Sequence, residues 1–98
     1  MRQIAVRVPP VTSIESAIRI YYENIEIGNQ EIIGLFGKIG SDRIVRLKRL
    51  AKNQMDEDEI PSWNGLRVNT KSAYKAWGLD ITDLEKRYKK LKQLGVGA

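Results

Sequence analysis

Hydrophobic residues recur at helical intervals near the start of this 98-residue chain. Intervals of three and four residues place apolar side chains on one side of a helix. Thr12 and Glu15 have the T-x-x-E spacing of a capping box, which satisfies free backbone N–H groups at a helix start. The pattern predicts a helix over about 13–25, with an apolar side formed by Ile14, Ala17, Ile18, Tyr21 and Ile25.

Two further helices are predicted on either side of a turn bracketed by glycines at 37 and 40. Asn29 is a favourable N-cap for a short helix through about residue 36. Ser41 is expected to cap a longer helix over about 42–55. The longer helix has an inward apolar stripe formed by Ile44, Leu47, Ala51 and Met55.

The C-terminal third of the chain predicts two more helices. One starts at Asn69 or Thr70 and runs through Trp77, where Gly78 closes it. The last covers about 81–94, with a capping box formed by Thr82 and Glu85. Its apolar positions recur at heptad-like spacing, which fits either packing on the domain or a seam between two copies. These positions are Ile81, Leu84, Tyr88 and Leu91.

Two segments have β-sheet signals. Residues 1–10 contain the alternating Ile4, Val6 and Val8 before two prolines. This arm is either a strand or flexible. A strand would pair within the fold or across a dimer. Asn64-Gly65 is the preferred pair for a two-residue hairpin turn. We therefore expect a short hairpin between about residues 60 and 68, with Trp63 and Val68 on its buried side and Asn64 and Arg67 on its exposed side.

The composition excludes several classes of site. The chain has no cysteine and no histidine, which removes disulfides, thiolate zinc sites and nucleophile–histidine pairs. No acid–base pair or phosphate-binding loop is apparent, so we expect a protein that is not an enzyme and needs no cofactor. No apolar run approaches the roughly 20 residues that span a bilayer, and no signal peptide is recognisable, which predicts a cytoplasmic protein without membrane contact.

Positive charge is concentrated in one predicted helix. The chain has a net charge of +5 and a pI near 9.6. Residues 38–54 contain six basic side chains against Asp42, whereas residues 55–60 contain four acids, which we interpret as a solvated helix end without the ligand spacing of a calcium loop. With about 100° per residue, the side of the long helix opposite its apolar stripe is basic and amide-bearing. It carries Asp42, Arg46, Arg49 and Asn53, with Arg43 on the flank.

A basic helix that follows a shorter helix and a tight turn is the pattern of a helix-turn-helix, here over residues 29–53. Ile33, Gly34, Ile39, Ser41, Ile44 and Leu47 have the spacing of its packing positions, with Gly34 at the helix crossing. Arginine reads guanine in a DNA major groove, so Arg43 and Arg46 are candidates for base contacts and Asp42 for cytosine. Arg49 and Lys52 are candidates for contacts with DNA phosphates through their side chains. The N-terminal ends of the two helices, at Asn29 and Ser41, are candidates for phosphate binding through their backbone amides.

A wider segment resembles a known family. The order of elements resembles the winged helix-turn-helix of excisionases and MerR-type regulators of phages and mobile elements. A helix, a turn and a recognition helix are followed by Ile60-Pro61, a hairpin, Arg67-Val68 and a helix ending in Ala76-Trp77. The resemblance covers about residues 29–78. It implies base contacts by Arg43 and Arg46 and wing contacts by Asn64, Gly65 and Arg67. The longer recognition helix, the acidic run and the helices outside the motif depart from the family pattern.

The sequence therefore predicts one mostly α-helical DNA-binding domain over 1–98, with a winged helix-turn-helix core at 29–78, an extra N-terminal helix and a C-terminal helix at 81–94. Its predicted role is an excisionase-like architectural factor or small transcriptional regulator that binds duplex DNA. The last helix and the N-terminal strand are the candidate surfaces for a homodimer, and the oligomeric state is left open. The alternative is a small oligomeric DNA-packaging subunit. The predicted DNA-binding residues are Asn29, Lys38, Ser41, Asp42, Arg43, Arg46, Arg49, Lys52, Asn53, Asn64 and Arg67.

The aromatic residues support two interpretations. Tyr21, Tyr22, Tyr74, Tyr88, Trp63 and Trp77 could stack on single-stranded bases, but such spacings are more typical of a core. We interpret Trp77 as a core anchor beneath the wing. The chain lacks the aromatic, basic strands of the common single-strand RNA-binding modules, which favours duplex DNA over RNA.

Overall fold

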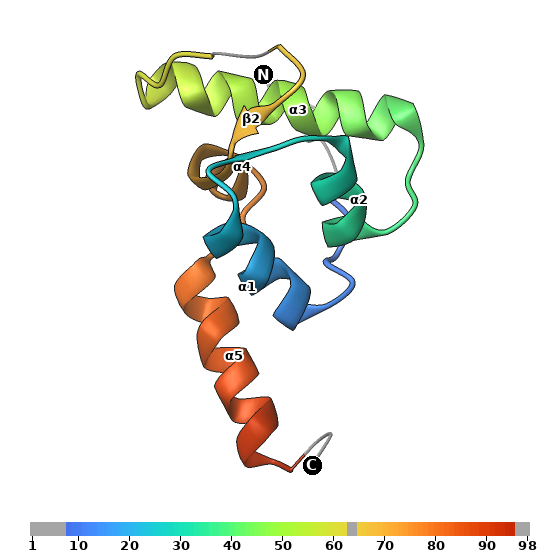
Figure 1. Ribbon diagram of the computed structural model, residues 1–98, viewed down its shortest axis with the longest axis vertical. Coiled ribbons are helices and arrows are strands. Elements are labelled where there is room, and N and C mark those ends of the chain that lie inside the picture. Colours follow the sequence, from blue (N-terminus) through green and yellow to red (C-terminus); the bar gives the residue numbers. More distant parts are fainter. Residues whose placement is uncertain (1–7, 63–64, 96–98) are drawn as a thin grey trace, which may run out of the picture.

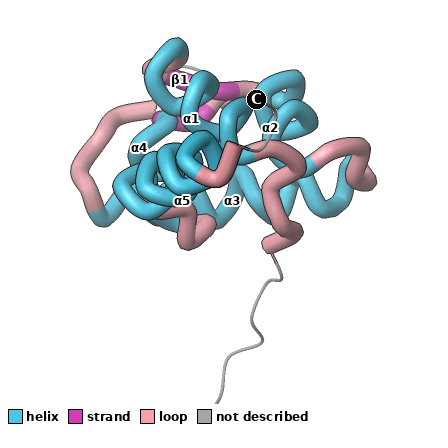
Figure 2. Tube along the Cα trace, turned by 90° about the horizontal axis from the view of Figure 1, so that it is seen from below, coloured by secondary structure: helices cyan, strands magenta, loops and turns pink. Residues whose placement is uncertain are grey.

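The protein is mostly helical and has one short two-stranded sheet (Figures 1 and 2). The computed structural model describes residues 8–62 and 65–95, so the predicted strand at 3–8 lies largely outside the described residues, as do Trp63 and Asn64. The elements follow in the order α1 (Ile14–Glu23), β1 (Glu26–Ile27), α2 (Asn29–Phe36), α3 (Ser41–Glu57), β2 (Val68–Asn69), α4 (Thr70–Ala76) and α5 (Ile81–Gln93).

The core forms mainly where α3 packs on α4 (Figure 1). The predicted stripe of α3 is confirmed, because Ile44, Leu47, Ala51 and Met55 are all buried. Trp77 is also buried and donates a hydrogen bond of 2.9 Å from Nε1 to the carbonyl oxygen of Leu47. The Trp77 ring meets the Phe36 ring edge to face at a centroid distance of 5.5 Å. The interpretation of Trp77 as a core anchor is therefore confirmed.

A second contact joins α1 to α2 and α4. The Tyr74 hydroxyl donates a hydrogen bond of 2.6 Å to the carbonyl oxygen of Ala17 in the interior. A Cβ added at Gly34 would lie 3.3 Å from Ile20 Cδ1, so Gly34 faces α1. The predicted place of Gly34, at the crossing of α2 and α3, is therefore wrong. Ile33 is 41% exposed, whereas the neighbouring Ile32 and the residues Leu35 and Phe36 form the packing side of α2.

The helices begin close to the predicted positions, but the capping residues differ. At α1 the Ser13 hydroxyl accepts from Ser16 N–H at 3.2 Å. Thr12, predicted as the cap, instead binds the end of α2 through a hydrogen bond of 2.8 Å from its N–H to the carbonyl oxygen of Leu35. At α5 the Asp80 carboxylate, rather than Thr82, accepts from the first-turn N–H groups.

Glycines occupy the N-cap positions of α2 and α3. The caps are Gly28 and Gly40, so Asn29 and Ser41 are the first helical residues, contrary to prediction. Glu31 replaces a side-chain cap at α2, because its carboxylate accepts the Gly28 N–H at 2.7 Å. The start of α4 follows the prediction, with the Asn69 side chain accepting from the Ser72 N–H at 2.9 Å.

The sheet differs from the predicted hairpin. Val68 and Asn69 of β2 pair antiparallel with Ile27 and Glu26 of β1, a partner far away in the sequence. Residues 60–62 form no strand. The physical reason is burial, because Ile27 and Val68 are fully buried as a cross-strand pair, which a local hairpin at residues 60–68 would not provide.

Helix α5 begins beside the end of α1 and extends away from the other elements (Figure 1). Leu84 is buried and Ile81 packs against the core, which confirms packing of the first turns on the domain. Leu91 is 38% exposed and Leu94 is 71% exposed. Within the described residues, the apolar stripe of α5 is therefore buried only in its first turns.

Candidate nucleic-acid interface

The outer side of α3 is formed mainly by polar side chains. Asp42, Arg46, Arg49 and Asn53 are exposed opposite the buried stripe, and Arg43 is exposed on one flank. None of these five side chains forms a hydrogen bond or ion pair with another residue in the described part of the chain. Packing of α3 on α4 fixes the helix, so these side chains project from a rigid support. We call them the α3 outer face.

The turn before α3 sets the angle at which the helix leaves α2. Gly37 has φ +84°, a conformation that favours glycine, and its N–H donates to the Ile33 carbonyl oxygen at 2.7 Å. A Cβ at this position would also meet the Thr12 methyl group at 3.2 Å. Lys38 is exposed in this turn and Ser41 is exposed at the start of α3. Both predicted residues therefore border the α3 outer face.

On the other flank of α3, two lysines hold the chain that returns toward β2. Lys48 Nζ donates to the Leu66 carbonyl oxygen and Lys52 Nζ donates to the Gly65 carbonyl oxygen, both at 2.8 Å. Partial burial lowers the pKa of Lys48, with further contributions from the charges of Lys52 and Arg67. Lys52 was predicted as a phosphate contact, and the structure gives it an internal partner instead. Residues 65 and 66 are thereby kept beside α3.

Arg67 has a different position from the predicted one. It was expected on the exposed side of a hairpin, but it is partly buried and donates from Nη2 to the Glu26 carbonyl oxygen at 2.7 Å. Its Nη2 also lies 3.8 Å from Glu31 Oε1. Arg67 thus joins β1 to the start of α2. Sequence patterns gave no signal for this role, because the Glu26 carbonyl oxygen and the Glu31 carboxylate come near Arg67 only in the folded chain.

Asn29 is exposed at the first residue of α2. A shallow hollow separates this helix end from α3 and from the turn at residues 65 and 66. Its lining includes Asn29, Gln30, Lys48 and Leu66. The structure therefore brings the start of α2, one flank of α3 and the returning chain to a common edge. Asn64 lies outside the described residues.

One exposed apolar residue was missed. Val45 is 53% exposed and neighbours Arg46 on the surface of α3. An apolar side chain beside arginines is suited to the methyl group of thymine in a DNA major groove. Its position outside the apolar stripe of α3 was the available signal.

The acidic run at the end of α3 is only partly a solvated helix end. Asp56, Glu57 and Glu59 are exposed, but Asp58 accepts hydrogen bonds from Ser72 Oγ at 2.8 Å and Lys75 Nζ at 3.0 Å. These contacts, with Ser72 the largest cause, lower the pKa of Asp58. Asp58 therefore fixes the end of α3 to α4. Across the described ranges, no three acidic side chains converge on a possible metal site.

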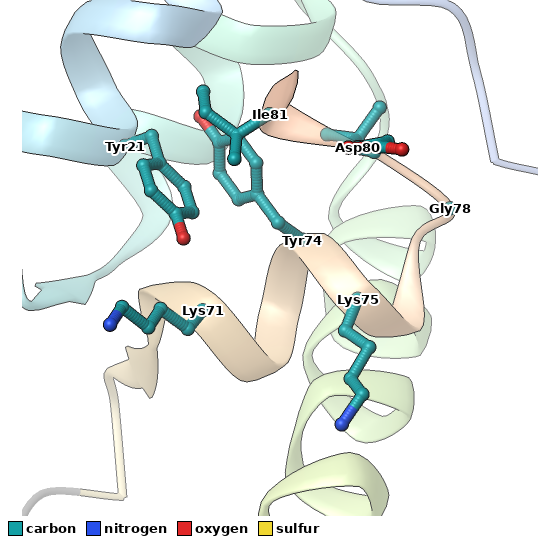
Figure 3. A pocket seen from close by; sticks show the side chains of 8 residues that line it. Tyr21, Lys71, Tyr74, Lys75, Gly78, Asp80 and Ile81 are labelled. Atoms are coloured by element: carbon teal, nitrogen blue, oxygen red, sulfur yellow. The ribbon is translucent and has the colours of Figure 1, made fainter. Parts of the chain in front are cut away.

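The tyrosines are mostly structural. Figure 3 shows a hollow beside α4 in which the Tyr21 and Tyr74 rings lie next to each other, with Lys71 and Lys75 at the rim. The two rings meet edge to face at 5.0 Å, and burial raises the pKa of Tyr74. Tyr22 is exposed, and its hydroxyl donates to Glu85 at 2.7 Å. The core interpretation is therefore confirmed for Tyr74 and Trp77.

Comparisons with known protein families, with curated proteins and with solved structures found no match. Among the helices of the described residues, none combines the length and the apolar character needed to cross a membrane.

Proposed function

We propose that this protein binds duplex DNA by inserting the α3 outer face into a major groove. The observation that supports this most directly is a set of three exposed arginines on the outer side and one flank of a helix with a buried apolar stripe. None of the three has a hydrogen-bond or ion-pair partner among the described residues. An α-helix fits the width of the major groove, and arginine donates two parallel hydrogen bonds to guanine. The protein performs no chemistry of its own in this role.

The positions of the arginines favour a division of roles. Arg43 and Arg46 lie in the N-terminal half of α3, and we assign them to base edges. Arg49 and Asn53 lie farther along the helix. We assign Arg49 to a DNA phosphate, and Asn53 to either an adenine base or a phosphate. Successive residues rise about 1.5 Å, so Arg43 to Arg49 covers about 9 Å, comparable with two to three base-pair steps.

The chain at residues 65 and 66 is proposed as the tip of a wing. Lys48 and Lys52 hold its carbonyl oxygens beside α3, where it would face an adjacent backbone phosphate or minor groove. The short helix α2, the longer helix α3, a following segment of this kind and α4 together support a winged helix-turn-helix interpretation. On that basis we propose an excisionase-like architectural factor or a small transcriptional regulator of a phage or mobile element.

A packaging or assembly subunit is the second candidate function. The half-exposed stripe of α5 favours it, because such a surface is available for contact with another chain. Light scattering separates the two candidates. A ring-sized oligomer favours assembly, whereas a monomer or dimer favours the DNA-binding factor.

In vitro selection from a random duplex library tests the proposal. We expect a consensus site, and we expect Arg46→Ala to relax base choice at one position, with a loss of about 1–3 kcal/mol for the preferred base. A palindromic consensus implies a dimer, whereas tandem direct sites imply adjacent loading of monomers. An unchanged ratio of specific to non-specific affinity in Arg46→Ala would remove this residue from base recognition.

A further inference from the structure

The distal part of α5 has an apolar stripe that the described residues cover only in part. Beyond Leu84, the stripe continues through Tyr88, Leu91 and Leu94, of which the last two are 38% and 71% exposed. None of these three belongs to the core cluster or packs against it. Helix α5 points away from the remaining elements in this region (Figure 1). Two turns of isolated helix are only marginally stable in water, so a partner would stabilise them.

The same part of α5 carries a positive charge that is only partly neutralised by ion pairs among the described residues. Its basic residues are Lys86, Arg87, Lys89, Lys90 and Lys92. The two acids of the helix already have partners, since Asp83 accepts from Arg87 at 2.8 Å and Glu85 accepts from Tyr22 at 2.7 Å. Four lysines therefore remain without a counter-charge in the described residues, and Lys92 lies 5.2 Å from the centroid of the Tyr88 ring.

We propose that the distal part of α5, residues 86–93 with the C-cap Leu94, is a docking surface for an acidic amphipathic helix of a partner protein. An apolar side of that helix would cover Tyr88, Leu91 and Leu94, and its flanking carboxylates would face the lysines. Lys92 borders the stripe, and opposite charges on flanking positions select partners in paired helices.

The alternatives fit the surface less well. A second copy of α5 would bring two uncompensated basic helices together, and like charges facing one another oppose association. DNA phosphates would meet the lysines but would leave the two leucines exposed. A lipid surface usually takes a longer helix with a broader apolar side.

The proposed surface is compatible with DNA binding. Helices α3 and α5 lie at opposite ends of the view in Figure 1. An acidic helix on α5 would leave the α3 outer face free, so the protein would connect a DNA site to a second protein. This inference goes beyond DNA binding and does not depend on it.

Fluorescence anisotropy with a labelled synthetic peptide tests the proposal. The probe is a three-heptad helix with leucines at its a and d positions and glutamates at e and g, titrated with the full chain. The matched probe has lysines at e and g. We expect saturable binding of the glutamate peptide that weakens with salt, and no binding of the lysine peptide.

Variants on α5 locate the surface. We expect Leu91→Ser and Lys92→Glu each to weaken binding by on the order of tenfold. Lys86→Glu makes the same charge change on the same helix, but residue 86 lies roughly opposite the stripe at about 100° per residue, so we expect a smaller loss. Ile25→Ser removes an 84% exposed apolar side chain elsewhere and should bind like the original protein. Arg46→Ala should also bind the peptide normally, which separates this result from the DNA-binding proposal.

Each opposing outcome is measurable. Equal binding of the two peptides, or equal losses in Lys92→Glu and Lys86→Glu, would overturn the proposal in favour of non-specific charge attraction. A dimer in light scattering that Leu91→Ser converts to a monomer would overturn it in favour of a second copy. Stronger Leu91-dependent binding to phosphatidylserine vesicles than to the peptide would overturn it in favour of a lipid surface. Circular dichroism confirms that each variant remains folded.

Discussion

Helices α3 and α5 have the same kind of sequence pattern but different surroundings. Both combine an apolar stripe with many basic residues. In α3 the stripe is buried from Ile44 to Met55, whereas in α5 burial ends after Leu84. Helix α3 packs on α4 and on β2, whereas the main contact of α5 within the described residues is with α1.

The difference determines what each helix can present. A helix whose apolar side is fully packed offers only its polar side, in a fixed orientation, which suits recognition of a rigid duplex. A helix with a half-covered stripe offers apolar and charged groups together, which suits a protein partner. Periodicity predicts both helices equally well, and only the tertiary contacts distinguish their roles.

The largest expected effect is the loss of stability when a buried apolar side chain of α3 is truncated. Leu47 is 1% exposed, so Leu47→Ala should lower the free energy of unfolding by about 3 kcal/mol, through lost burial and the remaining cavity. The corresponding change in α5, Leu91→Ala, should alter it by less than about 0.5 kcal/mol. Urea unfolding followed by circular dichroism measures both. Equal losses would mean that α5 is packed as tightly as α3.

A smaller effect is expected at the start of α5. Asp80 accepts hydrogen bonds from the N–H groups of Thr82 and Asp83, so Asp80→Ala should cost about 1 kcal/mol. Thr82→Ala serves as the control and should change little, because Thr82 is not the cap. Thermal unfolding of the two variants is the measurement. A larger loss in Thr82→Ala would restore the capping box expected from sequence.

The pH dependence of stability tests the contact between α3 and α4. Hydrogen bonds from Ser72 and Lys75 lower the pKa of Asp58 in the folded state. A lowered folded pKa gives stability that is present above the unfolded value, near pH 4, and is lost as pH falls through the folded pKa. Urea unfolding from pH 6 to pH 2 should show a smaller acid-induced loss in Asp58→Asn than in the original protein. Identical pH profiles would remove Asp58 from this contact.

The sequence predicted the parts of the fold that depend on local periodicity. The stripe of α3, the core position of Trp77 and the closure of α4 before Gly78 follow from spacing and from backbone preferences. Caps were less predictable, because Ser13 and Asp80 compete with Thr12 and Thr82 a residue or two away. The backbone conformation just before each helix decides which side-chain oxygen reaches the free N–H groups of the first turn.

Long-range pairing was the part that sequence patterns missed. Asn64-Gly65 signals a local hairpin, but the pairing of Ile27 with Val68 depends on burial between distant segments. The same limit applies to the site. The exposure of Arg43, Arg46 and Arg49 followed from the helix period, whereas the internal partners of Lys52 and Arg67 follow from the returning chain.

Binding of a fluorescein-labelled duplex, carrying the selected site and titrated at several salt concentrations, tests the central proposal most directly. The variant Arg43→Ala/Arg46→Ala/Arg49→Ala is compared with Lys86→Ala/Lys89→Ala/Lys90→Ala, which removes the same charge from α5. We expect the α3 variant to lose on the order of a hundredfold in affinity or more, and the α5 variant to lose far less. Equal losses in both variants, or unchanged affinity in the α3 variant, would contradict DNA recognition by α3.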